Sequence, residues 1–418
     1  MERYDLLYRL YEEFETETLR EYQELVDLFP PVDSRVALDA WQEANDELTE
    51  RKDEIREAFA AGETVADVAA RADREQAFTA LDLQTRYGRE LDALVLDVDE
   101  TLRSAGRTDN EIPRETLHLL TEFHDDGVPI VICTGQTLEN VKGFMIQGLG
   151  NELVHSGRFS VVYEAGTGVF TPGHGSDTKR LLYEELDDDV RAVFDRVRSR
   201  VLSDAPETVR RCCHLQGNEF NVTLKPNFET GSDDAARVID EAMAWLLDLL
   251  GEAAATVVDA DIDREAGVAA ARAHYADADP ELREVLEREG VRFGDDPTPA
   301  PALTELLDRV DAAYYHADAA EIGSRELDKP TGVQAALDVL GVGDPFVLVM
   351  GDSKSDLRVM RWAADSDAGM AAAPEHASQE VLEHVLSTDE LVFDRGEAAE
   401  VLRTAYVLNR LSALATDS

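Results

Sequence analysis

Residues 93–102 constrain the fold most, because an apolar run leads directly into two carboxylates and a hydroxyl. The run 93–96 is rich in Val and Leu without polar alternation, which is typical of a parallel strand covered on both faces by helices. Residues i and i+2 of a strand point to the same side, so Asp97 and Asp99 can face one ligand where the strand ends. The alternative is a solvated loop, since an acidic chain also produces Asp-x-Asp by chance.

The net charge limits the classes of molecule that this chain can bind. The 418 residues include 88 acidic and 40 basic side chains, for a net charge of -48, which disfavours nucleic acid and anionic membranes as partners. Only six of the basic residues are lysine. This pattern is typical of a protein that works in concentrated salt, as in an extreme halophile, where ions screen the self-repulsion. The 44% hydrophobic content argues against a disordered acidic chain.

The cysteine pattern and hydropathy indicate a compartment. The three cysteines form no Cys-x-x-Cys pair and no disulfide framework, which fits a reducing environment. The first residues lack a basic region followed by an apolar stretch, and no run approaches 18 apolar residues. We therefore expect a soluble cytoplasmic protein.

Periodicity divides the chain into three parts. Residues 1–88 predict a helical extension, interpreted either as a bundle packed on the next domain or as a surface for self-association into a homo-oligomer. Residues 89–171 and 326–418 alternate strands with helices and predict an α/β core with a parallel sheet. Residues 172–325 predict an inserted α+β domain, with a pair of strands over 210–225, a helix over 233–250 and a strand over 255–259.

Polar side chains follow three of the predicted strands. Asp97 and Asp99 follow the first, Thr134 and Gly135 the second, and Asp352 the third, with Asp356 one helical turn beyond. The carboxyl ends of parallel strands meet at one edge of a sheet, so these groups should gather there. Gathered carboxylates repel one another, which predicts a hard divalent cation, Mg²⁺ above all.

Lys329 supplies a further fixed positive charge for this site. A phosphoryl group suits such a place, because a metal, a lysine and the Thr134 hydroxyl can offset its charge. The inserted domain carries polar residues that we interpret as substrate contacts, with ordinary surface positions as the alternative. They are Arg211, Asn221 and Lys225.

The ordered set Asp-x-Asp-x-Thr, Thr, Lys and Gly-Asp-x-x-x-Asp resembles the haloacid dehalogenase (HAD) superfamily. The long insertion between Thr134 and Lys329 is similar to the branch with a C2 cap after the second motif, subclass IIB, which contains sucrose-phosphate, trehalose-phosphate and mannosylphosphoglycerate phosphatases. The resemblance implies a Rossmannoid core with an inserted cap. It covers 89–171 and 326–418, and the cap by placement only.

The resemblance also implies residue roles. Asp97 would be the nucleophile and Asp99 the general acid and base, while Thr134 and Lys329 would hold the phosphoryl group. Mg²⁺ would be bound by Asp97, the Asp99 backbone carbonyl and Asp352, with Asp356 in support. Three residues depart from the subgroup pattern. Gln136 stands where Arg is common, and Glu100 and Pro330 each stand where Gly is common.

Together these features predict a Mg²⁺-dependent phosphatase acting on a sugar phosphate or a similar small polyol phosphate. Two alternatives remain. A phosphomutase would share the nucleophile but release an isomer, and a non-catalytic regulatory protein would keep the fold for binding.

Overall fold

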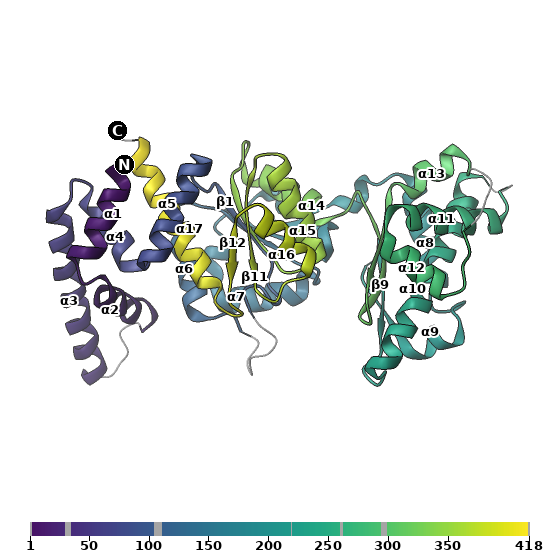
Figure 1. The fold of residues 1–418 in the computed structure, drawn as a ribbon, viewed down its shortest axis with the longest axis horizontal. Coiled ribbons are helices and arrows are strands. Elements are labelled where there is room, and N and C mark those ends of the chain that lie inside the picture. Colours follow the sequence, from purple (N-terminus) through teal and green to yellow (C-terminus); the bar gives the residue numbers. More distant parts are fainter. Residues whose placement is uncertain are drawn as a thin grey trace. The chain divides into compact units, whose positions relative to one another are not determined.

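The structure is a computed structural model that describes residues 2–29, 35–103, 111–218, 220–259, 262–293 and 299–416. The chain forms two compact units, which we describe separately (Figure 1). The first comprises residues 1–165, 169–180 and 333–418, and the second comprises 166–168 and 181–332. Among the described residues, every helix is too short or too polar to cross a lipid bilayer.

An eight-stranded sheet organises the first unit. Its strand order is β12-β11-β10-β1-β2-β3-β4-β5, and the neighbours from β12 to β3 pair in parallel. The strands are β1 (Ala93–Leu96), β2 (Ile130–Cys133), β3 (Phe159–Tyr163), β4 (Gly168–Phe170), β5 (Lys179–Leu181), β10 (Val347–Met350), β11 (Gly369–Pro374) and β12 (Leu391–Phe393). The predicted α/β class with a parallel sheet is therefore confirmed.

Helices surround this sheet and precede it. They are α1 (Glu2–Glu13), α2 (Thr16–Leu28), α3 (Arg35–Ala58), α4 (Gly62–Arg71), α5 (Arg74–Tyr87), α6 (Arg114–Asp125), α7 (Leu138–Val154), α14 (Lys329–Leu340), α15 (Lys354–Asp365), α16 (Gln379–Ser387) and α17 (Ala398–Thr416). Of these, α14 begins at the end of the second unit and continues into the first. The sequence also favours Asp33 and Ser34 as the cap of a helix, and both lie outside the described residues.

Local sequence explains where α5 begins and ends. The Asp73 side chain accepts the Gln76 backbone N–H at 2.8 Å, and the Gln76 side chain accepts the Asp73 N–H at 3.0 Å. This reciprocal pair satisfies two N–H groups that a helix start leaves open. Gly88 ends the helix with φ of 65° and donates its N–H to the Gln84 carbonyl at 2.8 Å. A side chain would strain this left-handed position.

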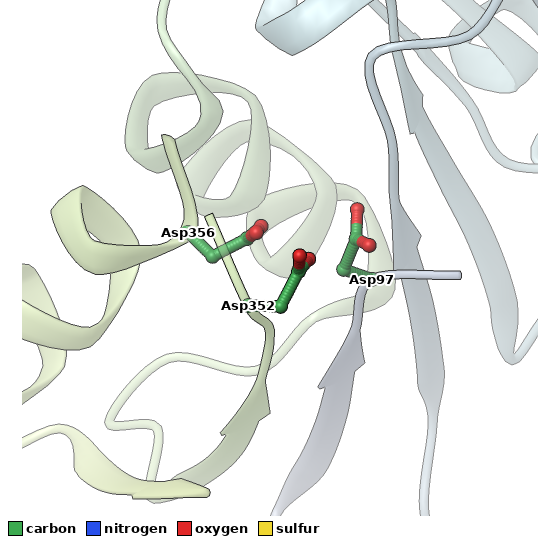
Figure 2. A group of neighbouring side chains, drawn as sticks. All are labelled: Asp97, Asp352 and Asp356. Carbon is green, nitrogen blue, oxygen red and sulfur yellow. The ribbon is translucent and has the colours of Figure 1, made fainter. Parts of the chain in front are cut away.

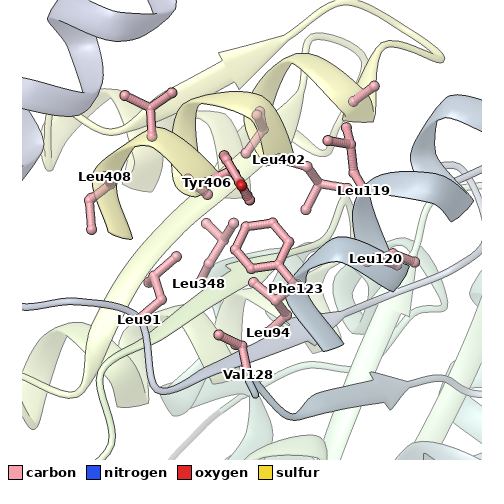
Figure 3. Packing of buried hydrophobic residues seen from close by; sticks show 14 of the residues in the cluster. Leu91, Leu94, Leu119, Leu120, Phe123, Val128, Leu348, Leu402, Tyr406 and Leu408 are labelled. Atoms are coloured by element: carbon pink, nitrogen blue, oxygen red, sulfur yellow. The ribbon is translucent and has the colours of Figure 1, made fainter. Parts of the chain in front are cut away.

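The strands of the sheet are buried on both faces. Leu94 and Leu348 face α6 and α17, where Phe123 and Tyr406 meet edge to face at 6.0 Å between ring centroids (Figure 3). Val95 is also buried and points to the opposite face by strand alternation. Helix α15 packs against β10 and β11. Two-sided burial explains the continuous apolar runs in the sequence.

The N-terminal helices share this core. Leu7, Leu10 and Leu19 are at most 1% exposed and belong to the same apolar cluster as Leu94 and Leu348. Helix α5 packs against α17, and α2 packs against α6. The structure thus accounts for the buried faces of these helices by packing on the sheet unit. Self-association through them stays a prediction.

The second unit is built on a four-stranded antiparallel sheet of order β6-β7-β9-β8. Its elements are α8 (Asp188–Arg200), α9 (Glu207–Cys212), β6 (Cys213–Gln216), β7 (Asn221–Pro226), α10 (Ser232–Val258), α11 (Arg264–Ala278), α12 (Pro280–Arg288), α13 (Pro301–Leu307), β8 (Val310–Tyr315) and β9 (Ala319–Ser324). Helix α10 packs against β7 and β9.

The predicted strand over 255–259 is wrong, because α10 continues through Val258. The predicted helix end at residue 250 is also wrong, and Gly251 lies within α10, where it serves the packing of two helices. A Cβ on Gly251 would lie 2.5 Å from the Gly267 carbonyl oxygen of α11, so only glycine permits this close approach.

Candidate active site

Three carboxylates meet at the carboxyl edge of the parallel sheet. Strands β1 and β10 are neighbours, and the Asp97 N–H extends their ladder by donating to the Met350 carbonyl at 2.9 Å. Asp352 follows β10, and Asp356 lies in the first turn of α15. Oxygen atoms of the three side chains lie within 4.8 Å of one another (Figure 2). The structure therefore brings together three of the predicted metal ligands.

Asp356 is held by the start of its own helix. Its Oδ2 accepts the Ser353 N–H at 3.1 Å and the Ser353 hydroxyl at 2.6 Å. Gly351 leaves the room for this arrangement, because a Cβ there would lie 2.3 Å from the Asp356 Cβ. Glycine at the end of β10 is thus a steric requirement for placing the Asp356 carboxylate.

The electrostatics of this trio call for a cation. Asp97 is 7% exposed and Asp356 2% exposed, so water screens their charges poorly. Two like charges about 5 Å apart repel by roughly 3 kcal/mol at an effective dielectric constant of about 20. A divalent ion with oxygen ligands offsets this repulsion, and a set of carboxylates without nitrogen or sulfur suits Mg²⁺. The residues present fit a magnesium site.

Asp99 has different partners from the trio. Its Oδ1 accepts hydrogen bonds from Arg103 Nε at 2.9 Å and Arg103 Nη2 at 2.7 Å, and its Oδ2 accepts one from the Gln136 side-chain amide. The Asp99 side chain is 47% exposed, so it can still meet a ligand. Sequence analysis missed Arg103, although its position four residues after Asp99 is a recognisable signal for an ion pair.

Thr134 lies directly after β2, and its N–H donates to the Val162 carbonyl at 2.9 Å. Its hydroxyl oxygen accepts the Gln136 N–H at 3.1 Å, which leaves the hydroxyl proton available for an anionic oxygen. Thr134 is 1% exposed. Gly135 opens the turn towards α7, and a side chain there would meet no atom within 4 Å, so no steric need for glycine is evident. A turn into a helix start beside a hydroxyl suits an anion.

Lys329 is the first residue of α14 and is 4% exposed. It falls at the end of the second unit, whereas the sequence boundary at 326 placed it in the core. The backbone before it is tightly packed, because a Cβ on Gly166 would lie 2.0 Å from the Asp328 carbonyl oxygen. The role of Lys329 at a phosphoryl group remains part of our proposal.

The three predicted substrate contacts of the inserted domain are not equivalent. Asn221 and Lys225 lie on β7, on the same side as Thr223, which donates to the Asn221 side chain at 2.7 Å. Lys225 forms an ion pair with Asp318 at 3.4 Å. Arg211 lies on helix α9 rather than on the predicted strand, and its side chain is 75% exposed and 3.6 Å from Glu207. The strand prediction is wrong before residue 213.

Neither a protein-family model nor a curated protein sequence matches this chain. Solved structures do, among them phosphatases of the HAD superfamily. Trehalose-6-phosphate phosphatase from Aspergillus fumigatus is 14% identical with a TM-score of 0.44, and 79% of this chain aligns with 97% of that one. Sucrose-phosphatase from Synechocystis sp. PCC6803 is 13% identical with a TM-score of 0.41, and 76% of this chain aligns with 98% of that one.

A subclass IIB sugar phosphatase of the HAD superfamily is 16% identical with a TM-score of 0.41, and 76% of this chain aligns with 99% of that one. These identities and scores are low. The function proposed below therefore rests on the side chains of this chain.

Proposed function

We propose that this protein is a metal-dependent phosphomonoester hydrolase. The observation that carries the proposal is the carboxylate trio of Asp97, Asp352 and Asp356 at the carboxyl edge of the sheet, with oxygen atoms within 4.8 Å of one another. These three side chains would hold Mg²⁺, which when bound supplies positive charge against the phosphoryl oxygens. Thr134 and Lys329 would bind the same oxygens.

The reaction follows as two displacements. A carboxylate oxygen of Asp97 attacks phosphorus, the bond from phosphorus to the leaving oxygen breaks, and Asp99 gives that oxygen its proton. Asp99, now ionised, takes a proton from a water molecule that attacks the aspartyl phosphate. The bond between Asp97 and phosphorus then breaks, and inorganic phosphate leaves. Asp99 suits this role because it is half-exposed and its carboxylate lies outside the trio of described metal ligands.

A sugar phosphate, or a similar small polyol phosphate, is the substrate class we propose. The amide of Asn221 and the ammonium group of Lys225 are of the kind that binds sugar hydroxyls, and both lie on β7 of the inserted unit. We also propose a cytoplasmic location, which the cysteine pattern of the sequence supports.

The test is phosphate release from a panel of sugar phosphates with Mg²⁺ in concentrated KCl. We expect release from one or a few members, its loss on chelation of the metal, and a fall of at least about a thousandfold in Asp97→Asn. Asp125→Asn is the matched control, because that carboxylate is 72% exposed. Phosphate release by Asp97→Asn at the wild-type rate would refute the role of Asp97 as the nucleophile.

The same panel addresses the alternatives. Interconversion of sugar phosphate isomers without net phosphate release would identify a phosphomutase. A folded protein that does neither would point to a non-catalytic protein.

A further inference from the structure

We propose that Gln136 and Arg103 are positioning residues that hold Asp99 for proton transfer to the leaving group. This inference rests on the proposed function and extends it to two residues to which that function assigns no role. Their shared feature is that both donate hydrogen bonds to the Asp99 carboxylate.

The two donors fix both oxygens of one side chain. Arg103 donates to Oδ1 through Nε and Nη2, at 2.9 and 2.7 Å, and Gln136 donates to Oδ2. The Arg103 side chain is only 12% exposed, whereas that of Asp99 is 47% exposed. A half-exposed carboxylate would otherwise sample several rotamers, so a buried guanidinium on one side and an amide on the other restrict its orientation.

Gln136 also ties Asp99 to the phosphoryl side of the site. Its backbone N–H donates to the Thr134 hydroxyl oxygen at 3.1 Å, and its carbonyl accepts the Glu164 N–H at 2.9 Å. One residue therefore contacts both the expected phosphoryl donor Thr134 and the expected proton donor Asp99. These two backbone hydrogen bonds anchor Gln136, which then sets the separation between Thr134 and Asp99 that productive proton transfer requires.

The leaving group provides a way to detect this role. A sugar alkoxide is a strong base and leaves only with a proton, whereas nitrophenolate is a weak base that leaves without one. A residue that orients Asp99 as the acid should therefore matter for a sugar phosphate and hardly matter for p-nitrophenyl phosphate in kcat/KM, which reports the steps through departure of the leaving group. The later hydrolysis of the aspartyl phosphate, in which Asp99 acts as the base for both substrates, enters kcat alone. A residue that supports only the fold or phosphoryl binding should affect both substrates equally.

The experiment measures kcat and KM of Gln136→Met and Arg103→Met on the best sugar phosphate and on p-nitrophenyl phosphate. We expect kcat/KM for the sugar phosphate to fall about 10- to 100-fold, less than the roughly 100- to 10,000-fold that general acid catalysis as a whole contributes, because Asp99 itself is retained. For p-nitrophenyl phosphate we expect a change of less than about threefold. Arg103→Lys retains one hydrogen-bond donor, so its kcat/KM for the sugar phosphate should lie between those of the wild type and Arg103→Met.

Gln147→Met, at an exposed glutamine of helix α7, which begins two residues after Gln136, is the control. An equal loss of kcat/KM on both substrates would overturn the inference and leave the proposed function standing. A higher kcat/KM on the sugar phosphate would also overturn it, because Gln136 and Arg103 would then hold Asp99 in an unproductive orientation. A wild-type protein that hydrolyses neither substrate would refute the proposed function and this inference with it.

Discussion

At the scale of single residues, Glu100 has an unusual backbone. It lies between Asp99 and Thr101 with φ of 59°, in the left-handed region where a side chain costs about 1–2 kcal/mol. Its carboxylate lies 3.2 Å from Arg395 Nη2 and 3.3 Å from His376 Nε2. These contacts hold the side chain of the residue that follows the proposed acid and base, on a backbone whose strain the surrounding fold has to offset.

Two substitutions separate the strain from the contacts. Glu100→Ala keeps the strained backbone and loses these side-chain contacts, whereas Glu100→Gly loses the same contacts but relieves the strain. We expect the glycine variant to be more stable than the alanine variant by about 1 kcal/mol, measured as the free energy of unfolding in urea. An alanine variant as stable as the glycine variant would show that the φ value carries no strain.

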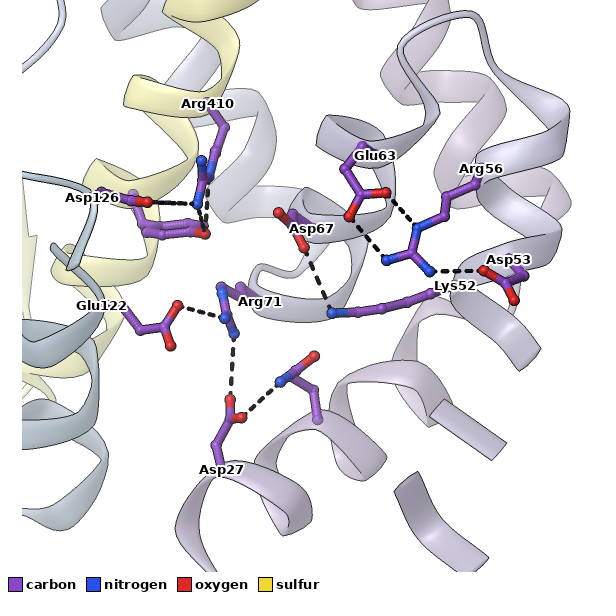
Figure 4. A network of polar contacts seen from close by, with 12 residues as sticks. Asp27, Lys52, Asp53, Arg56, Glu63, Asp67, Arg71, Glu122, Asp126 and Arg410 are labelled. Carbon is purple, nitrogen blue, oxygen red and sulfur yellow. Dashed lines mark hydrogen bonds and ion pairs between the residues drawn. The ribbon is translucent and has the colours of Figure 1, made fainter. Parts of the chain in front are cut away.

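At the scale of elements, buried charges join the N-terminal helices to the sheet unit. Arg71 of α4 lies 3.3 Å from Asp27 of α2 and 2.5 Å from Glu122 of α6 (Figure 4). Its guanidinium also lies over the Tyr406 ring of α17, 5.2 Å from the centroid. Four helices thus meet at one cation, and removing a partner would leave charge uncompensated in a poorly hydrated place.

The pH dependence of this junction follows from Asp27. Burial alone would raise the pKa of Asp27, but hydrogen bonding and charge from His118 together with the Arg71 charge outweigh it, and the net pKa lies below its ordinary value. A lowered pKa stabilises the fold above the unfolded value of about 3.9 and loses this contribution as the pH falls through the folded value.

We therefore expect Asp27→Asn to lower the free energy of unfolding at pH 7 by about 2 kcal/mol and to flatten its decline below about pH 5. Chemical unfolding at several pH values measures both effects. Asp53→Asn serves as control, since that carboxylate is 59% exposed in its ion pair with Arg56. An unchanged pH profile in Asp27→Asn would contradict the expectation.

The sequence predicted elements well where the signal is local. Asp97, Thr134 and Asp352 each follow an apolar run that does form a buried parallel strand, and strand ends of a parallel sheet meet by geometry. The predicted helix end at residue 250 and strand over 255–259 were wrong. Glycine is required at position 251 by the close contact with Gly267 on another helix. Periodicity along one segment contains no information about such a partner.

In the candidate site too, local features could be predicted and contacts between distant segments could not. The trio could be predicted from strand ends and spacing, whereas the hydrogen bond from Gln136 to Asp99 joins residues 37 positions apart. Only the pairing of β1 with β2 brings them together. Which strands become neighbours depends on the whole fold, and the local sequence around Asp99 or Gln136 contains no information about it.

At the scale of the whole molecule, the charge of -48 predicts that stability rises with salt concentration. Carboxylates repeat along one side of α3, where Asp46, Glu50, Asp53, Glu54 and Glu57 surround a shallow groove. At about 1 M salt the screening length is about 3 Å, so this repulsion is largely removed.

We expect the melting temperature to rise by at least about 5 °C between about 0.1 M and 1 M KCl, roughly 4 kcal/mol for a chain of this size. Differential scanning calorimetry measures this shift. Sorbitol at equal osmolality controls for solute exclusion, and an equal rise in sorbitol would assign the effect to exclusion rather than to screening.

The packing of α5 against α17 also decides when the protein can finish folding. The central strand β1 pairs with β10 some 250 positions later, and the face that carries Leu94 is covered by α17. A ribosome therefore releases the N-terminal helices and β1 long before their partners exist. The inserted unit, almost all of it one continuous stretch over 181–332, can fold during this interval. The sheet unit has to wait for α17, with its apolar surfaces exposed meanwhile to whatever chaperones the cell provides.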